Sequence, residues 1–339
     1  MRTPIVYMLA AILLLLSCRQ TPKQAFPEEK DISEYEQTQF LPTLEHCIST
    51  DTNSVYCATL LFAWDEVRNI IGAPLSISEE YQDLILLNAS TSYRNVLKDN
   101  EYKVKGEVQG NLITARAEFD KSLPFPCELQ KFNNSLTFDG QMVAAFGVAG
   151  YERDEMTNIV DILYYENDDN FIIKLVPTDT EHEIILFKTG NAYKTMAEMV
   201  AASDSLIKIG KQESVVDSTR WKYRFDDDDM VIIPDMSFNI STDFNKLINN
   251  TFTAKHESYR IIKAWQRIAF LLNETGAKIE SEAELEMALD ECSEFEEPVR
   301  HEPKRMIFDK AFFLILHRSD APHPYCCMHL VNSELMVKE

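Results

Sequence analysis

The chain has 339 residues, of which 45% are hydrophobic, so it can bury a sizeable core and global disorder is excluded. A formal net charge of -22 argues against binding to nucleic acid, which needs clustered Lys and Arg, and against adsorption to anionic lipid. With only 9 Gly and no familiar catalytic or nucleotide-binding motif, we expect no enzyme, no catalytic residue and no cofactor.

The N-terminus has the pattern of a processing segment. Arg2 is followed by the apolar run Ile5–Leu16, which fits a signal peptide and is too short to cross a bilayer. The run closes on Leu15–Cys18, which resembles a bacterial lipobox. The resemblance implies that residues 1–17 are removed and that Cys18 is lipidated. Because Arg19 follows instead of Asp, we expect an outer-membrane anchor; the alternative is a secretory peptide in which Cys18 is incidental.

Residues 18–40 are polar and contain Pro22 and Pro27, which predicts a tether ahead of a single domain over 41–339. Localisation in the cell envelope follows, facing either the periplasm or the exterior. An exported protein meets an oxidising compartment. Cys47 and Cys57 flank a short polar segment, so they could form a local disulfide or be buried as small apolar side chains.

Periodicity first predicts a helix over Tyr56–Ile71, with Ser54 as its N-cap and Gly72 at its end. Its apolar stripe is Leu60, Trp64, Val67 and Ile71. Ile85–Val96 is a shorter segment of ambiguous type. Two-residue alternation then predicts four strands: Glu101–Val108, Asn111–Phe119, Ser135–Phe138 and Met142–Val148.

Strands continue to dominate the second half, with helices expected at Thr195–Ile209 and Thr242–Phe252. Two hairpins are predicted, one from Ile159–Tyr165 and Phe171–Val176 and one from Met306–His317 and Tyr325–Met336. The other predicted strands are Met230–Pro234, Met236–Ile240 and the apolar run Ile261–Leu272. Mostly strands with a few helices indicate an α+β fold.

The stretch after Leu272 has a strict alternation. Asn273–Gly276 interrupts the apolar run, and small or apolar residues then alternate with charged ones. One side carries Ala277, Ile279, Ser281, Ala283, Leu285, Met287 and Leu289; the other carries Lys278, Glu280, Glu282, Glu284 and Glu286. A strand with this pattern buries one face and solvates the other. The same residues are strong helix formers, so a helix is the alternative.

Several segments, taken in order, resemble the serpin family. They are Ala115–Phe119 with Leu123–Phe125, Leu136–Gly140, Val160–Tyr165 with Phe171–Pro177, Val231–Leu247, Gln266–Ala277 and Phe308–His317. The resemblance implies a serpin-like α+β fold with large, mostly antiparallel sheets. It also implies a mobile loop that can enter a sheet as an extra strand.

The resemblance assigns roles along that loop. Residues 277–302 would be the bait for a serine or cysteine protease, with Glu274, Thr275, Gly276 and Ala277 as the hinge. The scissile bond would lie near Asp290–Glu291, and the catalytic nucleophile would belong to the protease. The stretch from the first helix to Gly110 is shorter than the family uses. A non-inhibitory envelope lipoprotein that keeps the scaffold for binding or assembly is therefore the alternative.

Two groups of residues could in principle bind metal. His317, His323, Cys326, Cys327 and His329 cluster in sequence, but they fit a buried hairpin equally well. Asp226–Asp229 offers oxygen ligands without the spacing of a calcium loop, so a solvated turn is the plainer interpretation. We expect no metal site at either place.

Overall fold

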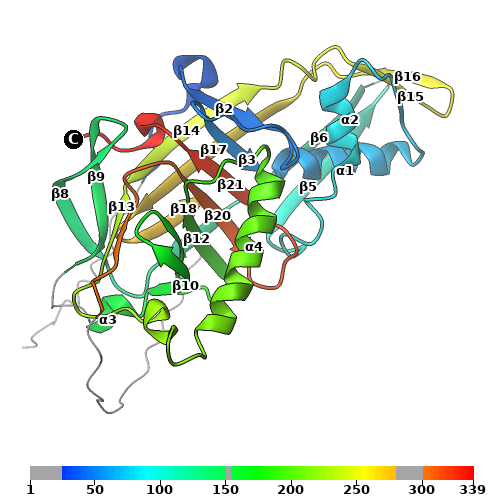
Figure 1. The fold of residues 1–339 in the computed structure, drawn as a ribbon. Coiled ribbons are helices and arrows are strands. Elements are labelled where there is room, and N and C mark those ends of the chain that lie inside the picture. The colour runs from blue at the N-terminus through cyan, green and yellow to red at the C-terminus, as the bar shows by residue number, and fades with distance from the viewer. Residues whose placement is uncertain (1–24, 111, 150–153, 280–300) are drawn as a thin grey trace, which may run out of the picture.

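A computed structural model describes residues 25–110, 112–149, 154–279 and 301–339 (Figure 1). Cys18 and the expected scissile pair Asp290–Glu291 therefore lie outside the described residues. Mostly antiparallel sheets and few helices make this an α+β protein, which confirms the predicted fold class.

A five-stranded sheet carries the segment of interest. Its order is β1 (Lys30–Asp31), β14 (Met236–Asp243), β17 (Trp265–Asn273), β18 (Gly276–Ile279) and β7 (Lys121–Pro124). β14, β17, β18 and β7 are antiparallel neighbours, and β1 is parallel to β14. β7 follows directly from the hairpin of β5 (Tyr102–Gln109) and β6 (Leu112–Phe119), which forms a sheet of its own.

The seven-stranded sheet lies at the centre of the core. Its order is β10 (Val160–Asn167), β11 (Asn170–Leu175), β12 (His182–Lys188), β20 (Phe312–Arg318), β21 (Cys326–Leu330), β3 (Asn53–Cys57) and β2 (Thr38–Leu41). Its central strands are almost continuously apolar and buried, as expected for strands covered on both faces. Both predicted hairpins are present, as β10–β11 and β20–β21.

Two smaller sheets complete the strands. A four-stranded sheet runs β19 (Arg305–Ile307), β13 (Met230–Pro234), β9 (Gln141–Val148) and β8 (Gln130–Phe138). A three-stranded sheet runs β16 (Glu257–Arg260), β15 (Thr251–Ala254) and β4 (Ser76–Ile77). The helices are α1 (Thr59–Ile71), α2 (Gln82–Ala89), α3 (Asp154–Thr157) and α4 (Met196–Glu213). Single 3-10 turns occupy Ile32–Glu34, Arg220–Tyr223 and Ser333–Leu335.

The structure differs from the sequence prediction at several elements. α1 begins at Thr59, because Asn53–Cys57 is fully buried as strand β3; its N-cap is Ala58 and not Ser54. The segment expected as helix Thr242–Phe252 is instead the end of β14, a series of turns and the start of β15. From residue 25 the expected tether is ordered, since β1 joins β14 and β2 joins β3.

Candidate functional site

β18 is the first part of the alternating segment, and it is an inserted strand. Residues 271–273 of β17 flank it on one side and residues 121–124 of β7 on the other, both antiparallel. Ala277 and Ile279 are buried, whereas Lys278 is half-buried on the opposite face. The predicted alternation, with its small and apolar residues inward, is therefore confirmed as far as Ile279.

Gly276 makes this insertion possible. Its φ of +135° is a conformation that side chains rarely adopt, and a Cβ there would lie 2.4 Å from the carbonyl oxygen of Leu123. In the preceding turn, the Asn273 side chain accepts hydrogen bonds from the backbone N–H and hydroxyl of Thr275, at 2.9 and 2.8 Å. The carbonyl of Thr275 accepts from Phe125 N–H at 2.9 Å, which fixes the turn against the end of β7.

Three charged groups surround the turn at residues 274–275. Lys131 Nζ lies 3.3 Å from Glu274 Oε2 and 3.4 Å from Asp235 Oδ2. Burial raises the pKa of Asp235 to about 6; Lys131 opposes this rise and Glu274 adds to it. Glu274, which the sequence predicts to be part of a hinge, thus belongs to a compact cluster with one buried carboxyl group.

A groove of about 1960 Å³ continues from the end of β18. One wall is β6, whose far edge pairs with β5. The other wall is residues 265–269 of β17, whose far edge pairs with β14. Among the described residues, no strand joins the two facing edges. β17 and β7 are both antiparallel to β18, so a strand continuing past Ile279 would run between these edges with the same polarity.

Helix α1 forms the floor of this groove. It packs against β5 and β6 and touches β17, and Figure 1 shows it beside the β5–β6 hairpin. Trp64 and Ile71 of its apolar stripe are buried, but Leu60 and Val67 are only half-buried and line the groove. Large apolar side chains are also exposed around the groove: Val108, Leu112, Ile262 and Trp265. Apolar surface left open in this way favours a further covering element.

A buried charged cluster lies where β18 meets the groove. Lys121, opposite Ile279, forms an ion pair with Glu101, and His182 Nε2 lies 2.9 Å from the same carboxylate. Burial works against ionisation of Glu101, but Lys121, the Lys98 N–H and His182 together hold its pKa at about 2. Burial and Lys121 lower the pKa of His182. The cluster therefore keeps a carboxylate ionised beside the last described residue of the hinge strand.

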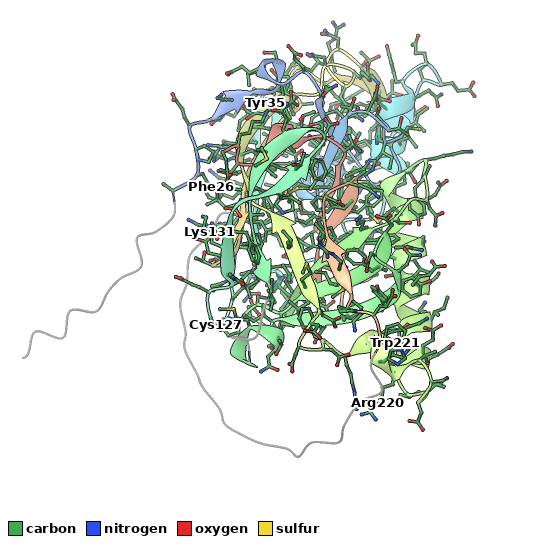
Figure 2. The ribbon with its side chains drawn as sticks, turned by 60° about the vertical axis from the view of Figure 1, so that its left-hand side comes forward. Phe26, Tyr35, Cys127, Lys131, Arg220 and Trp221 are labelled. Carbon is green, nitrogen blue, oxygen red and sulfur yellow. The ribbon has the colours of Figure 1, made fainter. Side chains whose placement is uncertain are left out.

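The described chain resumes at His301, at a second fixed point. Lys304 Nζ lies 2.7 Å from Asp229 Oδ2, with both side chains about 1% exposed, and the backbone N–H of Lys304 donates to Asp229 Oδ1 at 2.6 Å. The His301 ring stacks on Trp221 with centroids 4.1 Å apart. Asp229, expected in a solvated turn, is instead a buried anchor for this end of the loop. In Figure 2, Trp221 lies near the lower end of the molecule, away from Lys131 of the hinge cluster.

The other sequence candidates make separate contacts. His317 Nε2 is 2.8 Å from the carbonyl oxygen of Ala321, while His329 stacks on Phe313 with centroids 4.3 Å apart. Within the described parts of the chain, no three His, Cys, Asp or Glu residues converge as metal ligands. Cys47 and Cys57 are both free thiols, one exposed and one buried, so the local disulfide is not formed. No described helix is long and apolar enough to cross a membrane.

No protein-family model and no curated protein matches the sequence. Among solved structures, thyroxine-binding globulin in complex with thyroxine is 9% identical to this chain, with a TM-score of 0.38. The match covers 75% of this chain and 64% of the thyroxine-binding globulin chain. Native protease nexin-1 with heparin is 13% identical, with a TM-score of 0.36, and the match covers 70% of this chain and 61% of the nexin chain. A serpin from the trematode Schistosoma haematobium is 10% identical, with a TM-score of 0.36, and the match covers 66% of this chain and 58% of the trematode chain.

The chain thus spans about three-fifths of the length of these structures. Likeness at this level of identity and superposition establishes neither family nor activity. The features of this chain that bear on function are the groove, strand β18 at its end, and the fixed points on either side of residues 280–300.

Proposed function

We propose that this protein is a serpin-like protease inhibitor whose loop, residues 277–302, is the bait and then fills the groove beyond β18 as a strand. The single observation that supports this most is the groove itself. It begins where β18 ends, has a strand edge on each side, and has an apolar floor that is only half-covered. Cleavage of the loop by a serine or cysteine protease would release its N-terminal part to continue the insertion.

The register of β18 predicts which residues would meet on the inner face. Gly276 is opposite Pro124 and Lys278 is opposite Leu271. Extending both ladders places Ser281 between Phe119 and Ile268, and Ala283 between Ala117 and Gln266. The half-buried inner residues of β6 are themselves small or apolar, namely Ile113, Ala115, Ala117 and Phe119. The small and apolar side of the loop would therefore cover the apolar floor.

The same register brings two glutamates beside arginines on the outer face. Glu282 would stand between Arg267 of β17 and the like charge of Glu118 on β6, and Glu284 between Trp265 of β17 and Arg116 of β6. Both arginines are on the exposed face of their strands. Opposite charges directly across a strand pair stabilise a sheet, whereas a slip by one residue would bury the glutamates.

A first experiment would mix the mature chain with a panel of serine and cysteine proteases. A covalent band on a denaturing gel, heavier than either protein, would support trapping, and its cleavage site would fix the scissile bond. Clean cleavage between residues 277 and 302 with no such band would refute trapping.

Cysteine pairs then test the register. Ala283→Cys with Ala117→Cys, each with Cys292→Ser, should cross-link only after cleavage. Ala283→Cys with Arg116→Cys is the matched control, because the two side chains would lie on opposite faces. Cross-linking of the control pair alone would refute the proposed register.

A specific observation favours the second candidate, a non-inhibitory protein that uses the same scaffold for binding or assembly. β18 is already paired on both sides, so part of the free energy of insertion has been released before any cleavage. For this candidate we expect a cleavable loop, no covalent complex and little gain in stability on cleavage.

We also propose that the chain is attached to the outer membrane of the cell envelope through a lipid on Cys18. The pattern Leu15–Cys18 and the following Arg19 support this attachment. Metabolic labelling with a radioactive fatty acid should label the wild type and not Cys18→Ala. Equal labelling of both would exclude a lipid at this position.

A further inference from the structure

Two cysteines of the central sheet face each other across adjacent strands. Cys57 ends β3 and Cys326 begins β21, and they are directly opposite in an antiparallel ladder. The next residues along, Ala58 and Tyr325, are joined by a backbone hydrogen bond of 3.0 Å from the Ala58 N–H. Because hydrogen-bonded and non-hydrogen-bonded pairs alternate, Cys57 and Cys326 form a non-hydrogen-bonded pair.

That position suits a covalent bond. Residues in such a pair have Cα atoms about 4.5 Å apart and side chains on the same face. Disulfides span Cα separations of roughly 4.4–6.8 Å. Cys327 is opposite Tyr56, with its side chain on the other face, so it does not compete for Cys57. We propose that Cys57 and Cys326 are a disulfide-forming pair at the floor of the groove.

The surroundings favour reaction at Cys57. Both thiols are buried, and Cys57 is the one of the two that is among the residues lining the groove. Burial opposes ionisation of Cys57, yet hydrogen bonds from Cys326 and Thr59 outweigh it and hold its pKa below the ordinary value. Donating that hydrogen bond raises the pKa of Cys326. A thiolate is the nucleophile in disulfide exchange.

The oxidant we name is a low-molecular-weight disulfide such as oxidised glutathione. The Cys57 thiolate attacks one of its sulfurs, which forms a mixed disulfide and releases one glutathione thiolate. Cys326 then loses its proton and attacks the Cys57 sulfur, which forms the protein disulfide and releases the second glutathione. The two protein thiols lose two protons and two electrons, and the glutathione disulfide gains them.

The bond would tie the start of α1 to the central sheet. Cys57 directly precedes the Ala58 N-cap, and its carbonyl already accepts a hydrogen bond of 3.0 Å from Gln266 of β17. Oxidation would therefore fix the groove floor to β21 as well as to β17. The pairing of Cys57 with Cys326 does not depend on protease inhibition, because it follows from the strand register.

The test uses the full chain treated with oxidised glutathione, quenched in acid, unfolded, alkylated and mapped by mass spectrometry. We expect a cross-linked peptide pair containing residues 57 and 326, lighter by two hydrogens than the two free peptides. The exposed Cys47, which should acquire glutathione, reports that the oxidant was active. If Cys57 and Cys326 are both alkylated while Cys47 is modified, the proposal is wrong.

Cys326 and Cys327 fall in the same peptide, so two variants are needed to show which of them is bonded to Cys57. Cys327→Ser should keep the cross-link, and Cys326→Ser should abolish it and leave Cys57 as a thiol or a glutathione adduct. A cross-link that survives in Cys326→Ser would overturn the assignment. The result with the unmodified chain stands by itself if either variant fails to fold.

Discussion

Lys278 of the hinge strand lies over the ring of Phe26, with its Nζ 4.9 Å from the ring centroid. Phe26 belongs to an N-terminal segment, residues 26–29, that contacts three strands of the five-stranded sheet before β1 pairs with the edge strand β14. The carbonyl of Pro27 accepts a hydrogen bond of 2.8 Å from Asn239, and Glu29 lies 3.4 Å from Arg267 Nε. Figure 2 shows Phe26 on the same side of the molecule as Lys131. The segment expected as a tether therefore holds β14, β17 and β18 together.

Removing the aromatic contact should loosen β18. A cation–π contact at a partly exposed site contributes about 0.5–1 kcal/mol, which corresponds to a roughly two- to five-fold change in local opening. We expect Phe26→Ala to speed amide hydrogen exchange at residues 277–279 by that factor and to leave the central sheet unchanged. Glu28→Ala, at an exposed neighbouring position, is the matched control. Equal exchange in Phe26→Ala and the wild type would contradict this role.

Gly276→Ala should prevent the hinge from pairing with β7. The added Cβ would meet backbone atoms of Leu123 and Pro124 that cannot move aside singly, and the positive φ adds strain. We expect a loss of about 1–3 kcal/mol in urea unfolding and faster proteolysis next to Ile279. Gly190→Ala is the control, since its Cβ would meet nothing within 4 Å. Unchanged stability of Gly276→Ala would show that the insertion seen at β18 does not depend on glycine.

The buried carboxyl of Asp235 predicts a pH dependence at the hinge. Its folded pKa of about 6 is above its ordinary value of 3.8, so its contribution to stability is present below pH 3.8 and is lost as pH rises through 6. By this linkage the loss approaches about 3 kcal/mol.

Asp235→Asn should therefore gain stability relative to the wild type between pH 4 and 7. Urea unfolding across that range measures the difference. Asp243→Asn, at the exposed end of β14, is the control. A constant difference between Asp235→Asn and the wild type would exclude the assigned titration.

Lys304→Met should release the C-terminal anchor of the loop. Removing one partner of a buried ion pair leaves Asp229 charged and unpaired, which costs roughly 3–5 kcal/mol. We expect that loss in denaturant unfolding, together with new proteolysis near His301. Lys310→Met removes an exposed pair with Asp169 and should leave the unfolding free energy nearly unchanged. Similar unfolding curves for the two variants would contradict a buried anchor.

The sequence patterns predict an element well where the element depends on local signals, such as a capping residue or the alternation of one buried and one exposed face. The alternation after Gly276 predicted the strand and its buried side. The helix expected from Thr195 is α4, and the Thr195 side chain caps it by accepting a hydrogen bond from the Glu198 N–H. Gly72 ends α1 in the left-handed conformation, as its position predicted. In each case the signal is a short-range preference of the backbone or a two-residue period.

Long-range contacts account for what the patterns missed. Strand β12, His182–Lys188, is buried on both sides between β11 and β20, so it has little alternation to detect. The Asp229–Lys304 pair joins residues far apart in the chain, and nothing local to the Asp226–Asp229 run marks Asp229 as buried. The groove depends on the spacing of β6 and β17, which only the folded chain defines.

The thermal unfolding temperature of the mature chain, measured before and after a single cleavage within residues 280–300, shows whether the groove takes up the loop. If the released segment fills the groove, new strand pairing and covered apolar surface should raise the unfolding temperature by tens of degrees, because several residues gain ladder hydrogen bonds at once. No rise, or a fall, would mean that the groove does not accept the loop as a strand.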